Sequence, residues 1–167
     1  MQLIPLDPDN LEHVELTYDI LLKRYESCCI NITQSTMPSM EKHIATLKSD
    51  RFKYYYIIEY KKILIGVIYV INQNNELGFF LHARNSTTAY KQNKAELHAI
   101  VNSWPIDTNN TRKVFIYYYL KCAFDLLRNK HLNLTKITSK VNWDNDLSRS
   151  GTEFIGLKPK YIYYEYE

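Results

Sequence analysis

Three strand-like segments follow one another almost without interruption in the first half of the chain. They are Lys53–Tyr60, Ile63–Ile71 and Glu76–Leu81, and they are rich in the tyrosine, isoleucine and valine that favour strands. Only Lys61-Lys62 and Asn72–Asn75 separate them, so each strand is expected to reverse onto the one before it. The chain is therefore expected to form a small antiparallel meander, and this meander constrains the rest of the fold.

A short helical segment precedes the meander and a polar segment follows it. Met40, Ile44 and Leu47 have the spacing of one helix face, and Pro38 suits the first turn of such a helix. After the last strand the sequence becomes open and polar at residues 82–85. A ligand site is expected there.

Length, charge and cysteine content limit the class of protein. A chain of 167 residues is expected to form one domain, residues 1–167, with a sizeable core. The strongest apolar run, Ile63–Ile71, has about half the length that spans a membrane, and the N-terminus lacks the pattern of a secretory signal. Three cysteines without a C-x-x-C pair favour neither disulfides nor zinc, so no metal and a reducing, cytoplasmic location are expected. A net charge of +3 from scattered Lys and Arg residues disfavours nucleic acid as a partner.

Periodicity and capping residues predict further elements around the meander. They are the strand Gln2–Leu6, a helix after Asp9 or Asn10, the helices Ala89–Val101 and Val114–Arg128, the strand Leu134–Val141, a helix from Asn145 or Asp146 to about Ile155, and the strand Tyr161–Tyr166. This order predicts an α/β (α+β) fold with a mixed, mostly antiparallel sheet, a parallel pair at strands four and five, and helices on both faces. The stretch 83–111 is expected to be an atypical insertion. A ligand crevice is expected beyond the carboxyl end of strand four, near His82 and the start of the Val114 helix.

A series of short motifs runs along nearly the whole chain in a fixed order. They are Leu21-Leu22 with Arg24, Asn31-Ile32-Thr33, Pro38 with His43, Tyr54–Ile58, Ile65-Gly66 with Tyr69, Asn75-Glu76 with Gly78, Asn145 with Ser148, Gly156-Leu157, and Tyr164–Glu167. None of them is specific alone. Their order and spacing together resemble the GNAT N-acetyltransferase superfamily, and in particular its enzymes from glycan-biosynthesis clusters.

The resemblance implies an activity, a cofactor and partners. Enzymes of this superfamily transfer the acetyl group of acetyl-CoA to a primary amine, which attacks directly within a ternary complex. The acceptor implied here is a small molecule, a UDP- or dTDP-linked amino-deoxysugar, with neither nucleic acid nor a membrane as partner. A homodimer or a fusion to another glycan-biosynthesis domain stays open. So do two alternatives: an acetyltransferase for another small amine or a protein N-terminus, and a pseudo-enzyme or binding module that kept the fold.

The resemblance also implies catalytic and substrate-binding residues. Glu76 matches a catalytic or water-positioning glutamate, and His82 lies near the expected thioester. His43 is the best candidate on the acceptor side, as a base or a sugar contact, while Arg24 and Asn31 match positions near the same cleft. Structural alternatives stay open for four of them. Glu76 could be a solvated residue at a strand edge and His82 a helix cap. His43 could be bonded to nearby backbone, and Arg24 could lie on a helix surface.

Cofactor-binding residues are implied at two main places, the end of the fourth strand and the start of the Val114 helix. The strand end would pair with the pantetheine arm through its backbone, and the helix start would hold the CoA phosphates. The residues implied are Phe80, Leu81, His82, Asn110, Arg112, Lys113, Val114 and Asn145. The chain departs from the family pattern because it has no glycine between Gly78 and Gly151, so a merely polar helix start is equally open. Thr152 also stands where many of these enzymes carry a tyrosine as general acid.

Overall fold

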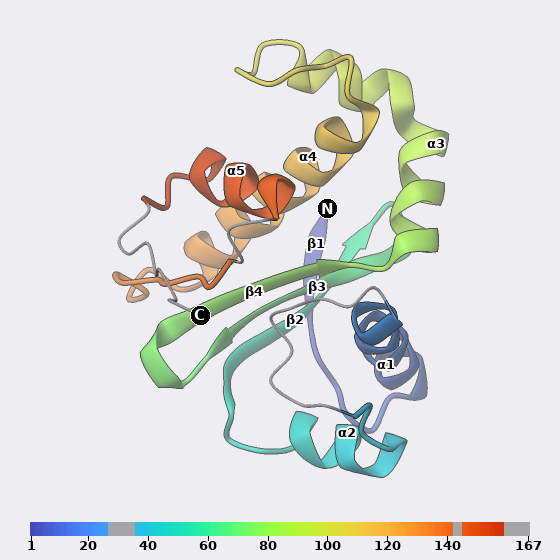
Figure 1. Ribbon diagram of the computed structural model, residues 1–167, viewed down its shortest axis with the longest axis vertical. Coiled ribbons are helices and arrows are strands. Elements are labelled where there is room, and N and C mark those ends of the chain that lie inside the picture. The colour runs from blue at the N-terminus through green and yellow to red at the C-terminus, as the bar shows by residue number, and fades with distance from the viewer. Residues whose placement is uncertain (27–35, 142–144, 159–167) are drawn as a thin grey trace, which may run out of the picture.

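The computed structural model describes residues 1–26, 36–141 and 145–158, and a four-stranded sheet forms its centre (Figure 1). The strands are β1 (Gln2–Pro5), β2 (Phe52–Tyr60), β3 (Ile63–Ile71) and β4 (Glu76–Leu81), paired antiparallel in the order β1-β2-β3-β4. The helices are α1 (Leu11–Glu26), α2 (Met40–Leu47), α3 (Ala83–Val101), α4 (Thr111–Lys130) and α5 (Asp146–Phe154), with a 3-10 turn η1 (Gln73–Asn75) before β4.

The meander predicted from the sequence is confirmed, with β2 starting one residue early at Phe52. Lys61 and Lys62 form the two-residue turn between β2 and β3, and both have positive φ, as a type I′ hairpin turn requires. Asn74 and Asn75 also have positive φ in the turn before β4, a conformation that asparagine tolerates better than most residues. Local sequence therefore accounts for three of the four strands.

Two glycines allow β3 and β4 to pack closely. A Cβ on Gly66 would lie 2.3 Å from the carbonyl oxygen of Phe80, and a Cβ on Gly78 would lie 2.2 Å from Cζ of Tyr69. Gly66 therefore permits a close approach of backbone, whereas Gly78 permits an aromatic ring to lie across the strand. Both glycines belong to the motifs Ile65-Gly66 and Asn75-Glu76 with Gly78.

Helices cover both faces of the sheet, as predicted (Figure 1). The face toward α3 and α4 carries the larger core, in which Ile58 and Ile68 of the sheet meet Leu97 of α3 and Leu127 of α4. The opposite face is smaller and is covered by α1, whose buried apolar residues pack on Ile57 and Val67. Alternation along each strand divides the side chains between these two cores.

The predicted parallel pair of strands four and five is wrong. The segment predicted as the strand Leu134–Val141 meets β4 through a single parallel bridge, Glu76–Thr138. Leu77 N–H donates to the Thr138 carbonyl (2.7 Å), and Thr138 N–H donates to the Asn75 carbonyl (3.1 Å). Of residues 134–141, Leu134 alone is buried and Ile137 is partly buried against the main core, so few apolar contacts would hold a full strand. The predicted strand Tyr161–Tyr166 lies outside the described residues.

The stretch 83–111 is a structured part of the core. The predicted helix Ala89–Val101 begins six residues earlier, directly after β4, as α3. α3 bends at Asn93, whose φ of −127° is not helical and whose side-chain amide donates to the Ala89 carbonyl (2.9 Å). α3 and α4 then pack together, with Leu97 and Tyr119 fully buried between them and the sheet.

Tyr119→Phe is expected to leave the free energy of unfolding unchanged or to raise it by about 1 kcal/mol. The Tyr119 ring is completely buried, its hydroxyl has no hydrogen-bond partner among the described residues, and burial raises its pKa. Tyr90→Phe is the matched control, because the Tyr90 hydroxyl lies 2.8 Å from His98 Nε2, and its loss is expected to cost about 1 kcal/mol. Urea denaturation of the three proteins measures both changes. If Tyr119→Phe lowered the free energy of unfolding by more than about 1 kcal/mol, the Tyr119 hydroxyl would have to form a hydrogen bond after all.

Candidate functional site

The outer edge of β4 carries peptide groups that no other strand pairs with over most of its length. Leu77 N–H points to this edge, toward Thr138, so Phe79 and Leu81, two and four residues on, present their N–H and C=O groups to it as well. Within the described part of the chain, only Thr138 bonds to this edge. Such an edge can accept an extended ligand as an added strand.

His82 stands at the carboxyl end of β4 and joins three elements. Its Nδ1 accepts from the Asn85 N–H (3.2 Å) and its carbonyl accepts from the Ser86 N–H (2.9 Å), so it caps α3. Its Nε2 lies 2.7 Å from Oδ2 of Asp19, a residue of α1. Both ring nitrogens therefore have partners, and Asp19 enters the site without having been predicted from the sequence.

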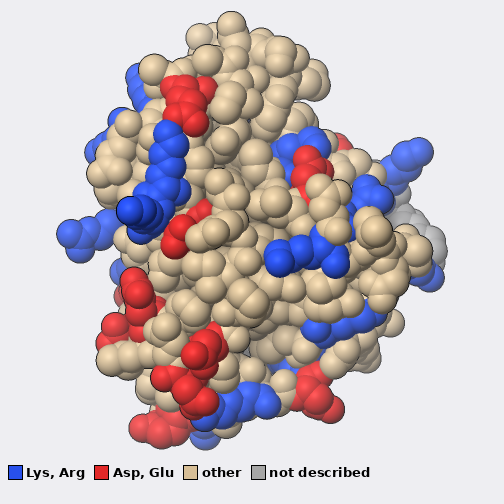
Figure 2. All heavy atoms as spheres, turned by 180° about the vertical axis from the view of Figure 1, so that it is seen from behind, with Lys and Arg blue, Asp and Glu red and all other residues tan. Residues whose placement is uncertain are grey.

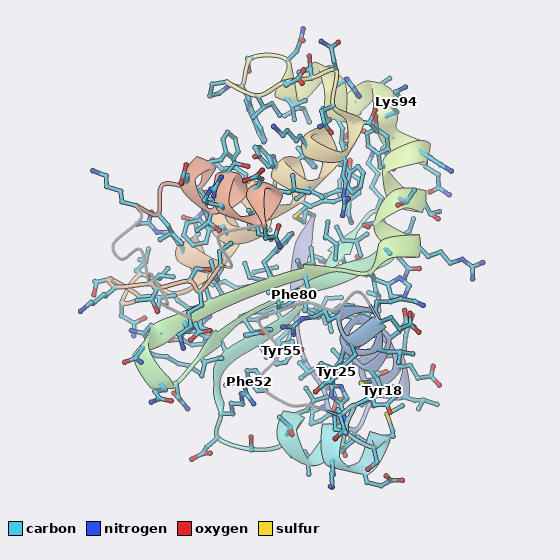
Figure 3. The ribbon with its side chains drawn as sticks, viewed as in Figure 1. Tyr18, Tyr25, Phe52, Tyr55, Phe80 and Lys94 are labelled. Atoms are coloured by element: carbon cyan, nitrogen blue, oxygen red, sulfur yellow. The ribbon has the colours of Figure 1, made fainter. Side chains whose placement is uncertain are left out.

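Arg24 and Phe80, two of the sequence-predicted residues, lie together on the α1 side of the sheet. The guanidinium carbon of Arg24 is 3.9 Å from the centroid of the Phe80 ring, a cation–π geometry. Phe80 continues an aromatic cluster with Tyr69, Tyr55 and Phe52, whose neighbouring ring centroids lie 4.6–6.1 Å apart (Figure 3). Burial raises the pKa of both Tyr55 and Tyr69, so their hydroxyls stay protonated.

His43 is buried between α1 and α2. The Thr17 hydroxyl donates to the Val14 carbonyl (2.9 Å) and lies 2.8 Å from His43 Nε2, so this ring nitrogen is the donor to Thr17. The Tyr18 ring meets the His43 ring edge-on at 5.4 Å between centroids. These contacts tie the two helices together, and the role of His43 as base or sugar contact stays a prediction.

The stability of the protein is expected to fall as pH drops below about 6.5, the ordinary pKa of histidine. Burial lowers the pKa of His43 and that of His131, so the unfolded chain takes up protons first as pH falls. The stabilisation from neutral His43 is then fully present above about pH 6.5 and is lost below it. Urea denaturation at pH 7.5 and 5.5 measures this loss.

His43→Gln is the control for that pH dependence, since an amide does not titrate but can still donate to Thr17. We expect the variant to lose less stability than the natural chain between the two pH values, while His131 keeps part of the dependence. An unchanged difference between the two pH values would rule out His43 as a contributor.

Glu76 lies at the opposite end of β4 from His82. Six residue steps along an extended strand separate them by about 20 Å, so the two side chains cannot contact one acceptor nitrogen together. Glu76 forms an ion pair with Lys140 (2.9 Å) beside the Thr138 bridge, and its side chain is 23% exposed. The structure thus separates two of the three predicted catalytic residues.

The predicted cofactor residues also fall into separate groups. The start of α4, residues 110–114, comes after α3, whose 19 residues lead away from the end of β4 over about 28 Å of helix length. Asn110 caps α4 there, with its side-chain oxygen accepting from the Lys113 N–H (3.1 Å). The helix start next to the end of β4 is that of α3. Its N-cap is His82 and not one of the usual capping residues Ser, Thr, Asp or Asn, so the sequence did not indicate this helix start.

The remaining predicted site residues lie at α5 or outside the described residues. Asn145 caps α5, accepting from the Ser148 N–H (3.0 Å), and Thr152 donates its hydroxyl to the Ser148 carbonyl (2.7 Å). Asn31 lies outside the described residues. Across residues 1–26, 36–141 and 145–158, no group of three or more His, Cys, Asp or Glu residues could hold a metal ion.

The surface carries mixed charges. On the side opposite to the view of Figure 1, Lys and Arg residues lie interspersed with Asp and Glu residues and wide uncharged areas (Figure 2). Among the helices described, none is long and apolar enough to cross a membrane. The absence of nucleic-acid and membrane partners stays a prediction.

Comparisons with known proteins support the fold. No protein-family model and no curated protein matches the chain. A solved structure does: the crystal structure of "a probable acetyltransferase" superposes with a TM-score of 0.54 at 13% sequence identity, covering 100% of this chain and 96% of the other. A likeness at this identity concerns the fold alone. The chain therefore has a mixed α/β fold similar to that of a probable acetyltransferase.

Proposed function

We propose that this protein is an acetyl-CoA-dependent N-acetyltransferase that acts on a primary amine. One observation carries the proposal: in a fold similar to that of a probable acetyltransferase, segment 134–141 meets β4 only at Thr138 and leaves the edge at Phe79 and Leu81 unpaired by any described residue. An extended ligand with its own amide groups fits such an edge.

The residues at the end of β4 fit the cofactor. The pantetheine arm of acetyl-CoA has two amide groups, which can pair with the outward N–H and C=O groups of Phe79 and Leu81. The first N–H groups of α3, at Ala83 and Arg84, have no partner within the helix, so this helix start would hold the CoA phosphates. Arg84 is exposed and adds a positive charge there. Acetyl-CoA, when bound, supplies the activated acetyl group.

The acceptor proposed is the amino group of a UDP- or dTDP-linked amino-deoxysugar of glycan biosynthesis, in the cytoplasm. The support is the order of the motifs, together with Arg24, whose guanidinium is suited to a phosphate or carboxylate. Arg24 contacts Phe80 on the α1 side of the sheet, where α1 and β4 meet. Among the predicted catalytic residues, His82 lies nearest the unpaired edge.

Acetyl-CoA binding is the first test. Millimolar acetyl-CoA is expected to raise the unfolding temperature, since a ligand at 100 times its Kd adds about 2.7 kcal/mol to the free energy of unfolding. Acetyl phosphate, which lacks the pantetheine arm and the nucleotide, is the control and is expected to give no comparable shift. No stabilisation by acetyl-CoA would contradict the proposed function.

An acetylation assay then tests the acceptor, with a panel of UDP- and dTDP-linked amino sugars, free amines and peptides with a free N-terminus. Transfer to the sugars supports the full proposal. Transfer only to the other amines keeps the reaction but replaces the acceptor. Binding of acetyl-CoA with no transfer to any of them favours the non-catalytic binding module.

A further inference from the structure

A shallow hollow lies along α3, and we call it the α3 hollow. It has a volume of about 540 Å³ and is lined by Lys91, Gln92, Lys94, Ala95 and His98. The bend of the helix at Asn93 falls between these residues. Lys94 lies on α3 well away from the aromatic cluster on the α1 side of the sheet (Figure 3). The hollow is thus separate from the residues around Arg24 and Phe80.

The two lysines of the α3 hollow carry charge that no nearby carboxylate neutralises. Across residues 1–26, 36–141 and 145–158, neither Lys91 nor Lys94 forms an ion pair. Glu96 is the closest acidic residue along the chain, but it lies on the other side of the helix. There it pairs with Lys61 of the β2–β3 turn and accepts from the Tyr60 hydroxyl (3.5 Å). The α3 hollow is therefore suited to an anion.

An imidazole adds a hydrogen-bond donor that is held in place by the core. Tyr90 is buried, and its hydroxyl lies 2.8 Å from Nε2 of His98. Within the described structure this nitrogen is the one acceptor in reach of the hydroxyl, so Tyr90 donates to it and the ring proton is on Nδ1. No described residue bonds to Nδ1, and His98 lines the hollow. Nδ1 can therefore donate to a ligand there.

The α3 hollow continues from the helix start at which the proposed function places the CoA phosphates. Arg84 and Lys91 are seven residues apart, so they share one face of α3, with about 10 Å of helix between them. Helical side chains lean toward the N-terminus, so Lys91 leans back toward Arg84. In CoA the pyrophosphate and the 3′-phosphate are attached to the same ribose. A ligand with its pyrophosphate beside Arg84 therefore brings the 3′-phosphate within reach of the hollow.

We propose that the α3 hollow binds the 3′-phosphate of CoA, with Lys91 and Lys94 as the charged contacts and His98 Nδ1 as a further donor. The inference rests on the proposed function and deepens it, because it makes the protein selective for an acetyl donor that carries this phosphate. A lysine binds phosphate as a flexible point charge, so an open hollow with two of them suits a phosphate group.

Calorimetric titration of the full chain with acetyl-CoA and with acetyl-dephospho-CoA is the first test. The two ligands differ only in the 3′-phosphate. We expect the natural chain to bind acetyl-CoA about 10-fold more tightly, and Lys91→Gln/Lys94→Gln to bind the two within about twofold of each other, since glutamine carries no charge. Equal affinities in the natural chain would overturn the proposal. So would a loss of affinity in the double variant that is the same for both ligands.

Two controls identify the charge at these positions as the cause. Lys91→Arg/Lys94→Arg keeps both charges and is expected to keep the preference for acetyl-CoA; loss of the preference in this variant would contradict the assignment. Lys42→Gln removes an exposed lysine from α2 and is expected to leave the affinities for both ligands unchanged. A lost preference in Lys42→Gln would show that the overall charge of the protein, and not the α3 hollow, sets it.

Binding of adenosine 3′,5′-bisphosphate, compared with AMP, keeps this inference distinguishable from the proposed function. Neither nucleotide carries an acetyl group or a pantetheine arm. We expect the natural chain to bind the bisphosphate more tightly than AMP, and Lys91→Gln/Lys94→Gln to bind the two alike. This selectivity without acetyl transfer to any acceptor would sink the proposed function and leave the phosphate site standing. Acetyl transfer with the same KM for acetyl-CoA and acetyl-dephospho-CoA would do the reverse.

Discussion

Gly66→Ala is expected to lower the free energy of unfolding by about 3 kcal/mol, a typical upper value for overpacking. The added methyl carbon would lie 2.3 Å from the Phe80 carbonyl oxygen and 2.9 Å from Leu81 Cα, and neither backbone atom can rotate away. β3 and β4 must separate to admit it, which also displaces the edge residues Phe79 and Leu81. Urea denaturation followed by circular dichroism measures the loss.

Gly78→Ala is the comparison for that prediction. Its methyl group would lie 2.2 Å from Cζ of Tyr69, but here the clash is with a side chain. Shortening that side chain removes the clash. The free energy of unfolding of the double variant Gly78→Ala/Tyr69→Leu is therefore expected to fall by less than the sum of the losses in the two single variants. For Gly66 the two nearest atoms belong to the backbone, so no shortened side chain can remove the clash. A Gly66→Ala protein within about 1 kcal/mol of the natural one would contradict the close approach of β3 and β4.

Leu97→Ala is expected to cost about 3 kcal/mol, in the range measured for buried leucines. Leu97 of α3 has no exposed surface, and its core also contains Ile68 of the sheet and Tyr119 of α4. If residues 83–111 were an independent insertion, the loss would be confined to them. Because they share the main core, we expect the whole protein to unfold at a lower urea concentration in one transition.

Two probes test this cooperativity. Circular dichroism reports on the helices as a whole, and the fluorescence of Trp104, which stacks on Tyr118 of α4, reports on the end of α3. Trp143→Phe is introduced throughout so that Trp104 is the remaining tryptophan. Lys94→Ala, an exposed position on the same helix (Figure 3), is expected to change stability by less than about 0.5 kcal/mol. A separate early transition of the fluorescence signal would show that α3 and α4 unfold on their own.

The meander and the helices could be predicted because their signals lie close together in the sequence. Apolar spacing placed α4 within three residues of its observed ends, and the capping residue Asn145 placed the start of α5. The strand Leu134–Val141 was wrong because its β-branched residues indicate only a local preference. Pairing along the length of β4 also requires packing against the core, and most of that segment remains partly or fully exposed.

The candidate site could be predicted only in part. The resemblance implied His82 and Phe80 at the end of β4, and both residues lie there. It also implied Glu76, His43 and the residues at 110–114, which the structure places at the far end of β4, between α1 and α2, and beyond α3. Spacing along the chain does not show that α3, a helix of 19 residues, separates the end of β4 from residues 110–114.

The sequence by itself determined the antiparallel meander and the helices α1, α2, α4 and α5, since each depends on residues that are near neighbours in the chain or in the hairpins. Only the tertiary structure decided that 134–141 meets β4 at a single bridge, that α3 starts at the end of β4, and that Asp19 reaches His82. Residues 19 and 82 come together because α1 packs across the sheet, and that packing is the summed result of the apolar contacts on one face.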